Sequence, residues 1–120
     1  MTVAEMEKFA EKWRTFNVKE TFHIFHIHEN LYKFALWGVE YARNISDRAL
    51  FLKLNGRLYK YWIAITVDSS DSYTVTFFKR NNTVKAKFEL INNQQLVGVI
   101  DDLVQNIPGY LEESAKIYAQ

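Results

Sequence analysis

Cysteine is absent from this sequence of 120 residues, proline occurs once and glycine occurs four times. The lack of cysteine excludes disulfides, thiolate metal sites and cysteine nucleophiles. With so little proline and glycine there is no linker or low-complexity tract, so we expect a single domain over residues 1–120. Apolar runs such as WIAI at 62–65 are far too short to cross a bilayer, and the acidic start MTVAEMEKFAEKW lacks the features of a signal peptide. We therefore expect a cytoplasmic protein that does not associate with membranes.

The motifs of common catalytic sites are also missing: there is no nucleophile elbow, phosphate-binding loop or dinucleotide fingerprint. Two pairs of neighbouring carboxylates need a separate explanation. Asp68 and Asp71 lie in a serine-rich turn, and Asp101 and Asp102 lie early in a predicted helix, where acids suit the helix dipole. Because neither pair belongs to a serine or cysteine nucleophile motif with a histidine base, we predict no enzymatic activity and no cofactor.

All three histidines lie within FHIFHIH, residues 22–28. In a strand His26 and His28 would share one face and His23 would take the other, whereas in a helix His23 and His26 would lie together and His28 would turn away. Neither geometry brings all three to one ion, and the nearest carboxylate is Glu29. We therefore predict no metal site in this segment.

Helical periodicity occurs at both ends of the chain. The spacing of apolar residues predicts an amphipathic helix over 3–15, with Thr2 as its N-cap. A second helix is predicted over 94–107, ended by the Pro108-Gly109 pair, and a short final helix is predicted over 110–118.

Residues 19–45 allow two interpretations. Their apolar residues alternate at spacings of three and four, which favours a helix through about Phe34. The alternative is a strand over 22–28, a turn at Glu29-Asn30 and a second strand across 35–43. Residues 37–44 are ambiguous because Gly38 weakens a helix and could mark a strand bulge.

From residue 48 the apolar period changes to two, which predicts strands over 49–54, 57–67, 73–79 and 84–90. Asn55-Gly56 is a strong hairpin signal, and polar turns follow each later strand. These strands predict an antiparallel meander of four strands, or of five if residues 35–43 supply one more. The fold class is therefore α+β, with helices before the sheet and helices after it that pack on one sheet face.

Strand alternation divides the sheet residues between two faces. The first face is apolar and is predicted to be the core: Leu50, Leu52, Leu54, Tyr61, Ile63, Ile65, Val67, Tyr73, Val75, Phe77, Val84, Ala86, Phe88 and Leu90. The second face mixes large aromatics with lysines and polar residues: Phe51, Lys53, Lys60, Trp62, Thr74, Thr76, Phe78, Lys85, Lys87 and Glu89.

The second face has two interpretations. Residues 48–88 carry eight basic and two acidic side chains (net +6), while the remaining seven basic and twelve acidic side chains sum to −5. An exposed face of aromatics and lysines would bind an acidic partner or stack nucleic-acid bases. Alternatively, the aromatics of residues 1–45 cover it. The first interpretation predicts a binding surface made of Phe51, Lys53, Lys60, Trp62, Phe78, Arg80, Lys85 and Lys87.

Three stretches follow a further pattern: FALWGVEYARNISDRALFLKL at 34–54, YWIAITVDSSDSYTVTFFKR at 61–80 and QQLVGVIDDL at 94–103. They give a Gly-led strand, a leucine-rich strand, a hairpin and an amphipathic helix, and the hairpin is marked by Ile65, Val67, Asp71, Tyr73, Val75 and Phe77. This pattern, over about residues 34–107, resembles a family of small phage and prophage proteins of unassigned function. The resemblance implies an accessory protein that binds a host factor, host-defence machinery included, and it brings no catalytic residues.

We therefore predict a phage-type interaction protein that acts by stoichiometric binding to a host protein. The alternative is a nucleic-acid-binding protein that uses the basic and aromatic sheet face. Self-association into a homodimer through an uncovered sheet face is a further option.

Overall fold

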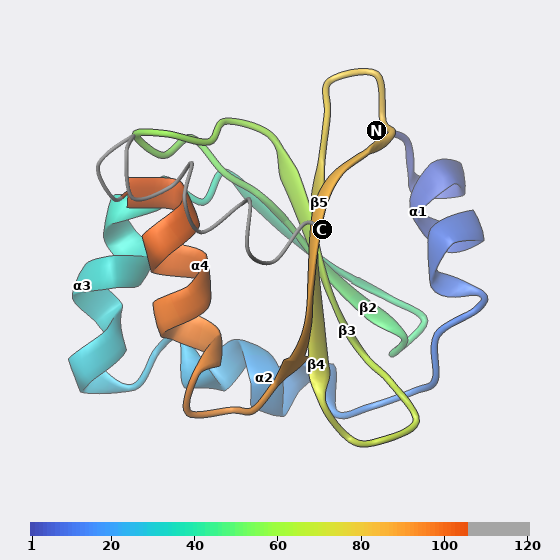
Figure 1. Ribbon diagram of the computed structural model, residues 1–120, viewed down its shortest axis with the longest axis horizontal. Helices are drawn as coiled ribbons and strands as arrows, with labels where there is room; N and C mark the ends of the chain where they lie inside the picture. Colours follow the sequence, from blue (N-terminus) through green and yellow to red (C-terminus); the bar gives the residue numbers. More distant parts are fainter. Residues whose placement is uncertain (106–120) are drawn as a thin grey trace.

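The computed structural model describes residues 1–105, which form a sheet with helices on both sides (Figure 1). The strands are β1 (Tyr41–Ile45), β2 (Ala49–Lys53), β3 (Trp62–Val67), β4 (Tyr73–Phe78) and β5 (Val84–Ile91). The helices are α1 (Val3–Ala10), α2 (Val18–Ile24), α3 (His28–Leu36) and α4 (Leu96–Gln105). Helix α1 lies alone on one face of the sheet, and the other three helices lie on the opposite face.

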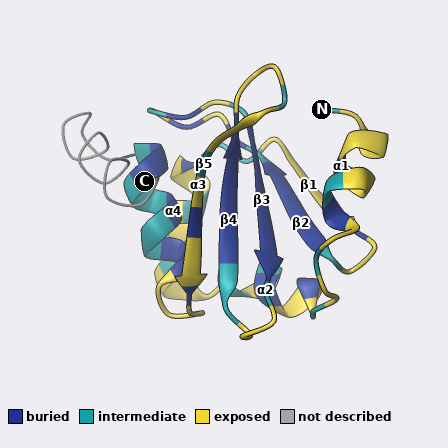
Figure 2. Ribbon diagram, turned by 45° about the vertical axis from the view of Figure 1, so that its right-hand side comes forward, coloured by how far each residue is buried: buried dark blue, intermediate teal, exposed yellow. Residues whose placement is uncertain are grey.

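The sheet has five antiparallel strands in the order β1-β2-β3-β4-β5, which confirms the predicted α+β meander in its five-stranded form. Its registers pair apolar residues with apolar residues, as in Leu50 with Ile65 and Ile63 with Phe77. These side chains face α2–α4 and form the main core with the apolar side of α4. The central strands are buried, whereas the two edge strands β1 and β5, helix α3 and the outer side of α1 are largely exposed (Figure 2).

Helix α1 begins where the sequence predicts and ends earlier. The Thr2 side chain accepts from the backbone N–H of Glu5, whose carboxylate accepts from the Thr2 N–H, so a capping box fixes the first turn. The helix ends at Ala10 rather than at residue 15, and the chain then crosses below the strand ends to α2 on the other face (Figure 1). The backbone N–H of Phe16 donates to the carbonyl of Asp47, which ties this crossing to the β1–β2 turn.

Residues 19–45 form two helices and a strand. The spacing favours a helix through about Phe34, and the structure has two helices there, α2 and α3, with a break at residues 25–27. The strand alternative for residues 22–28 is wrong. Gly38 takes a positive φ of 62° directly before β1, and a Cβ there would lie 2.5 Å from the carbonyl oxygen of Asn55, so only glycine fits this turn.

The Asn55-Gly56 pair does not form a hairpin turn, so that prediction is wrong. Strand β2 ends at Lys53 and β3 begins only at Trp62, and residues 54–61 form a loop between them. The N–H of Leu58 donates to the carbonyl of Val104 at 2.7 Å, and a Cβ on Gly56 would lie 2.2 Å from Cγ1 of Val104. Glycine is therefore required because α4 approaches the loop, not because two strands reverse direction.

Two irregularities in β5 correct the predicted core face. The register shifts between the pairs Tyr73–Ile91 and Val75–Phe88, and Leu90 takes a positive φ of 58°. As a result Leu90 is 72% exposed and Ile91, at 4%, takes the buried place instead. Val84, also predicted to be in the core, is half-exposed at the start of the strand.

Helix α4 lies within the predicted range 94–107, and Leu96, Val97, Ile100, Leu103 and Val104 are its buried residues. The short helix predicted over 110–118 lies outside the described residues. Within residues 1–105, no helix combines the length and the apolar character needed to cross a bilayer.

Candidate functional site

The three aromatics of the predicted binding surface are buried. Phe51, Trp62 and Phe78 are 0%, 6% and 3% exposed, in a second cluster with Met6 and Ala10 of α1. The Phe9 ring packs edge-on against Phe51 at 5.8 Å and Phe78 at 5.3 Å. An exposed aromatic platform is therefore wrong, and the alternative of a cover from the N-terminal region holds for this face.

The covering segment is α1 and not FHIFHIH, which packs on the opposite face of the sheet. Phe25 is wholly buried in the main core beside Trp37. The three histidines are exposed, and the ring of His26 lies between Phe22 at 4.7 Å and Phe34 at 4.9 Å. Within the described part of the chain, no group of three or more histidines and carboxylates is placed to hold a metal ion.

The predicted lysines do not share one surface. Lys53 lies over the ring of Tyr41, and Lys87 lies over Trp13 and forms an ion pair with Glu89. The register shift between Phe77 and Phe78 makes Lys85 the extra residue of β5. Lys85 therefore turns to the α4 side of the sheet, where its Nζ lies 5.6 Å from the ring centroid of Tyr59.

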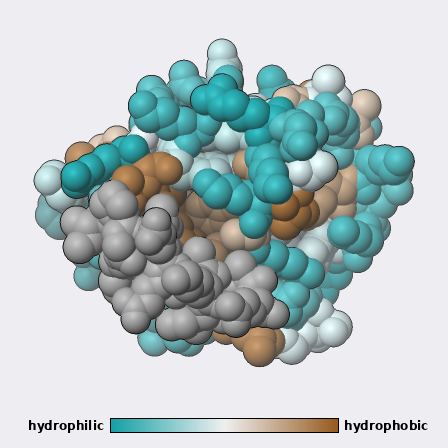
Figure 3. Space-filling model, turned by 45° about the horizontal axis from the view of Figure 1, so that its top comes forward, coloured by the Kyte–Doolittle hydropathy of each residue, from teal (hydrophilic) through white to brown (hydrophobic). Residues whose placement is uncertain are grey.

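Four of the eight predicted residues do meet, in a groove at the end of the sheet. Lys60, Phe78, Arg80 and Lys85 line a hollow of about 400 Å³ between the 54–61 loop and the β4–β5 turn. We call it the cationic groove, and its other described lining residues are Arg57, Leu58, Tyr59, Tyr61 and Lys79. In Figure 3 hydrophilic residues gather over this end of the molecule, with hydrophobic ones between them.

Tyr59 anchors the loop side of the groove. Its hydroxyl accepts from the N–H of Phe78 at 3.0 Å and lies within hydrogen-bond distance of the carbonyl oxygens of Trp62 and Phe78. Burial raises the pKa of this hydroxyl above its usual range, so Tyr59 is neutral at any physiological pH. The side chain therefore joins the loop to the start of β3 and the end of β4 as a fixed part of the groove wall.

The β4–β5 turn supplies the other side. Lys79 and Thr83 close it through an N–H···O bond of 2.8 Å, and Asn82 takes the left-handed conformation inside it. The Asn82 side chain accepts from the Tyr61 hydroxyl at 2.5 Å and donates to the Glu5 carboxylate at 2.9 Å. The turn is thus fixed between the loop and α1.

Charge is the main chemical property of this groove. It has five cations, Arg57, Lys60, Lys79, Arg80 and Lys85, and no acidic side chain among its described lining residues. None of the five forms an ion pair with another described residue. Cations crowded without counter-charges focus a positive potential, which attracts carboxylates or phosphates. The described lining has no histidine, carboxylate, serine or threonine, and its charged groups are all lysines and arginines.

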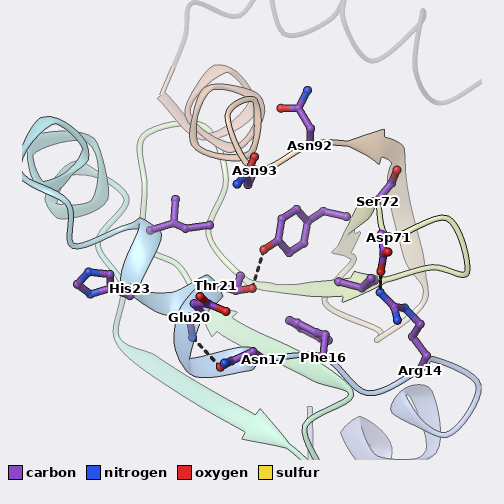
Figure 4. A pocket seen from close by; sticks show the side chains of 13 residues that line it. Arg14, Phe16, Asn17, Glu20, Thr21, His23, Asp71, Ser72, Asn92 and Asn93 are labelled. Atoms are coloured by element: carbon purple, nitrogen blue, oxygen red, sulfur yellow. Dashed lines mark hydrogen bonds and ion pairs between the residues drawn. The ribbon is translucent and has the colours of Figure 1, made fainter.

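A second hollow lies at the other end of the sheet, where sequence reasoning predicted nothing (Figure 4). It measures about 610 Å³ and is formed by the chain before α2, α2 itself, the β3–β4 turn and the β5–α4 connection. We call it the polar pocket. Arg14 and Asp71 form an ion pair at one margin, and Thr21 donates to or accepts from the Tyr73 hydroxyl at 2.7 Å within it. No sequence motif signals a pocket assembled from four distant segments.

The two hollows thus differ in chemistry: the cationic groove is rich in lysine and arginine, and the polar pocket has a lining of mixed polarity. Comparison of the chain with protein-family models, with curated proteins and with solved structures finds no match.

Proposed function

We propose that this is a non-enzymatic cytoplasmic protein that binds, in a stoichiometric complex, an acidic segment of a protein partner in the cationic groove. The observation that supports the proposal is the group of five cations with no acidic neighbour in the described lining. Two tyrosines contribute to the same walls. Positive charge would steer an acidic segment to the groove, and tyrosine surfaces would contact its apolar parts.

An acidic polypeptide suits the groove better than nucleic acid does. A nucleic-acid platform on this sheet would need exposed rings for base stacking, and Phe51, Trp62 and Phe78 are buried. The whole chain has a net charge of only +1 and an isoelectric point near 7.9, below the range typical of nucleic-acid-binding domains. A hollow of about 400 Å³ also fits a few side chains rather than a long phosphate backbone.

The resemblance of residues 34–107 to small phage and prophage proteins supports a host protein as the source of the acidic segment. Components of host defence are the first candidates under this proposal. Such a complex would act by occupying a surface of the partner, without turnover.

The experiment measures anisotropy of a fluorescent Glu-rich peptide, and of labelled single-stranded and duplex DNA, titrated with the full chain. Lys60→Glu together with Arg80→Glu should weaken peptide binding by roughly tenfold or more, because each reversal replaces attraction with repulsion. Lys19→Glu with Lys33→Glu makes the same charge change on exposed residues of α2 and α3, and should leave affinity within roughly twofold.

Tighter binding to DNA than to the peptide, lost in the groove variant, would replace the proposal with the nucleic-acid alternative. Equal losses in the two variants, or no binding to any probe at low salt, would refute it. Light scattering on the same samples separates a one-to-one complex from a homodimer, which would show a doubled mass without peptide.

A further inference from the structure

The polar pocket has the size of a small-molecule site, and its lining combines an apolar part with polar side chains. Its volume of about 610 Å³ lies within the range of ligand pockets, roughly 300–1,000 Å³. Phe16 and Tyr73 meet edge to face at 6.4 Å, and with Val67 and Ile24 they make the apolar part of its lining. The bond between the Tyr73 hydroxyl and the buried Thr21 side chain holds the Tyr73 ring in place.

Amide groups with unused hydrogen-bonding capacity surround this apolar part. The Asn17 Oδ1 accepts from the N–H of Glu20, and the Asn92 Oδ1 accepts from two backbone N–H groups before α4. Each of these asparagines therefore has an NH₂ donor with no partner among the described residues. The Asn93 side chain and the Glu20 carboxylate form no hydrogen bond within residues 1–105. Figure 4 shows Asn17 and Glu20 side by side at the start of α2, and Asn93 across the pocket from them.

The charges of the lining disfavour anions. Arg14 is its only formal cation among the described residues, and that guanidinium pairs with Asp71 and donates to the carbonyl of Asp68 at 2.9 Å. Glu20 is then a carboxylate without a counter-charge. A phosphate or carboxylate ligand would meet this carboxylate with no free cation to stabilise it.

We propose that the polar pocket binds a neutral, hydroxyl-rich ring, either a free sugar or the ribose of a nucleoside. Hydroxyl groups both donate and accept, so they match a rim with free NH₂ donors and free carboxylate and amide oxygens. The apolar face of such a ring would lie on Phe16 and Tyr73. This inference is independent of the cationic groove, which lies at the other end of the sheet.

The test is a ¹H–¹⁵N correlation titration of the full chain with two groups of probes. Adenosine and uridine form one group, the methyl glycosides of glucose and galactose form the other, and AMP and glucose 6-phosphate are the charged counterparts. We expect saturable shifts at the amides of Thr21, Tyr73 and Asn93 for at least one neutral probe. The phosphorylated probe of the same group, AMP or glucose 6-phosphate, should bind at least roughly tenfold more weakly. Whichever group saturates identifies the source of the ring.

The variant Glu20→Ala with Asn93→Ala removes two exposed groups that have no bond to other described side chains, and should weaken binding by at least roughly tenfold. Glu40→Ala with Asn55→Ala, the same changes at exposed positions outside the pocket, should not alter it. The inference fails if no neutral probe shifts these amides at roughly 10 mM, a concentration above weak small-ligand dissociation constants. It also fails if the pocket variant binds like the wild type, or if the phosphorylated probes bind as well as the neutral ones.

Discussion

Phe51→Ala tests whether α1 buries the aromatic side of the sheet. Phe51 is 0% exposed and contacts three rings, those of Phe9, Trp62 and Phe78, at centroid distances of 5.8, 6.4 and 6.1 Å. Truncating a wholly buried phenylalanine costs about 3–5 kcal/mol of unfolding free energy, and three ring partners place this residue in the upper half of that range. For a domain of this length the melting temperature should fall by roughly 10–20 °C.

The measurement is urea unfolding followed by circular dichroism, with the slope compared between variants to check two-state behaviour. Tyr41→Ala is the matched control, since this tyrosine also contacts Trp62 but is 56% exposed on the edge strand β1. It should cost about 1 kcal/mol or less. If Phe51→Ala costs no more than Tyr41→Ala, the aromatic face is open to solvent, and the sheet would regain the binding platform that alternation alone suggests.

Three further predictions concern stability. On β5, Ile91→Ala should cost about 2–4 kcal/mol in urea titrations and Leu90→Ala less than about 0.5 kcal/mol, and equal costs would contradict the bulge. Gly56→Ala should lower the melting temperature, because its Cβ would lie 2.2 Å from a valine of α4. Gly98→Ala should raise it, because alanine favours a helix over glycine and its Cβ would meet no atom within 4 Å. The reverse order would mean that the 54–61 loop does not pack on α4. Hydrogen bonds from a serine of its own turn hold the pKa of Asp68 below its usual range, so the stabilisation is present at neutral pH and is lost as acid protonates the folded carboxylate. Asp68→Asn should therefore flatten the decline of the urea midpoint below about pH 4, and an unchanged decline would exclude this source.

The sheet was predictable from the sequence because its signal is local. Leu50 and Leu52 on one strand, and Ile63 and Ile65 on the next, recur at a period of two and are buried as predicted. Leu90 breaks this rule, because a bulge inserts one residue into β5 and reverses the faces beyond it. A bulge leaves no periodic pattern in the sequence, so alternation assigns Leu90 to the wrong face of the sheet.

The candidate site was less predictable because it depends on contacts between distant segments. Strand alternation predicts that Lys60 and Arg80 share a surface with Trp62, but it is the loop fixed by Tyr59 and the turn fixed by Asn82 that bring them together in the groove. The Asn-Gly pair suggests a hairpin at residue 55, but glycine is needed there because a Cβ would collide with Val104 of α4. Neither contact is visible in a local window of sequence.

Helix α1 both covers the aromatic face of the sheet and fixes one wall of the cationic groove. It buries Phe51 and Phe78, and its Glu5 carboxylate also holds Asn82 and thereby the turn that carries Lys79 and Arg80. The fold thus separates Phe51 and Trp62, aromatics of the kind that dominate tight interfaces, from the cations, which it leaves in an open groove. Binding through such a groove depends on charge more than on buried apolar area, so fast, salt-sensitive association is expected. A measured affinity that changes little with salt would mean that the partner contacts a different surface.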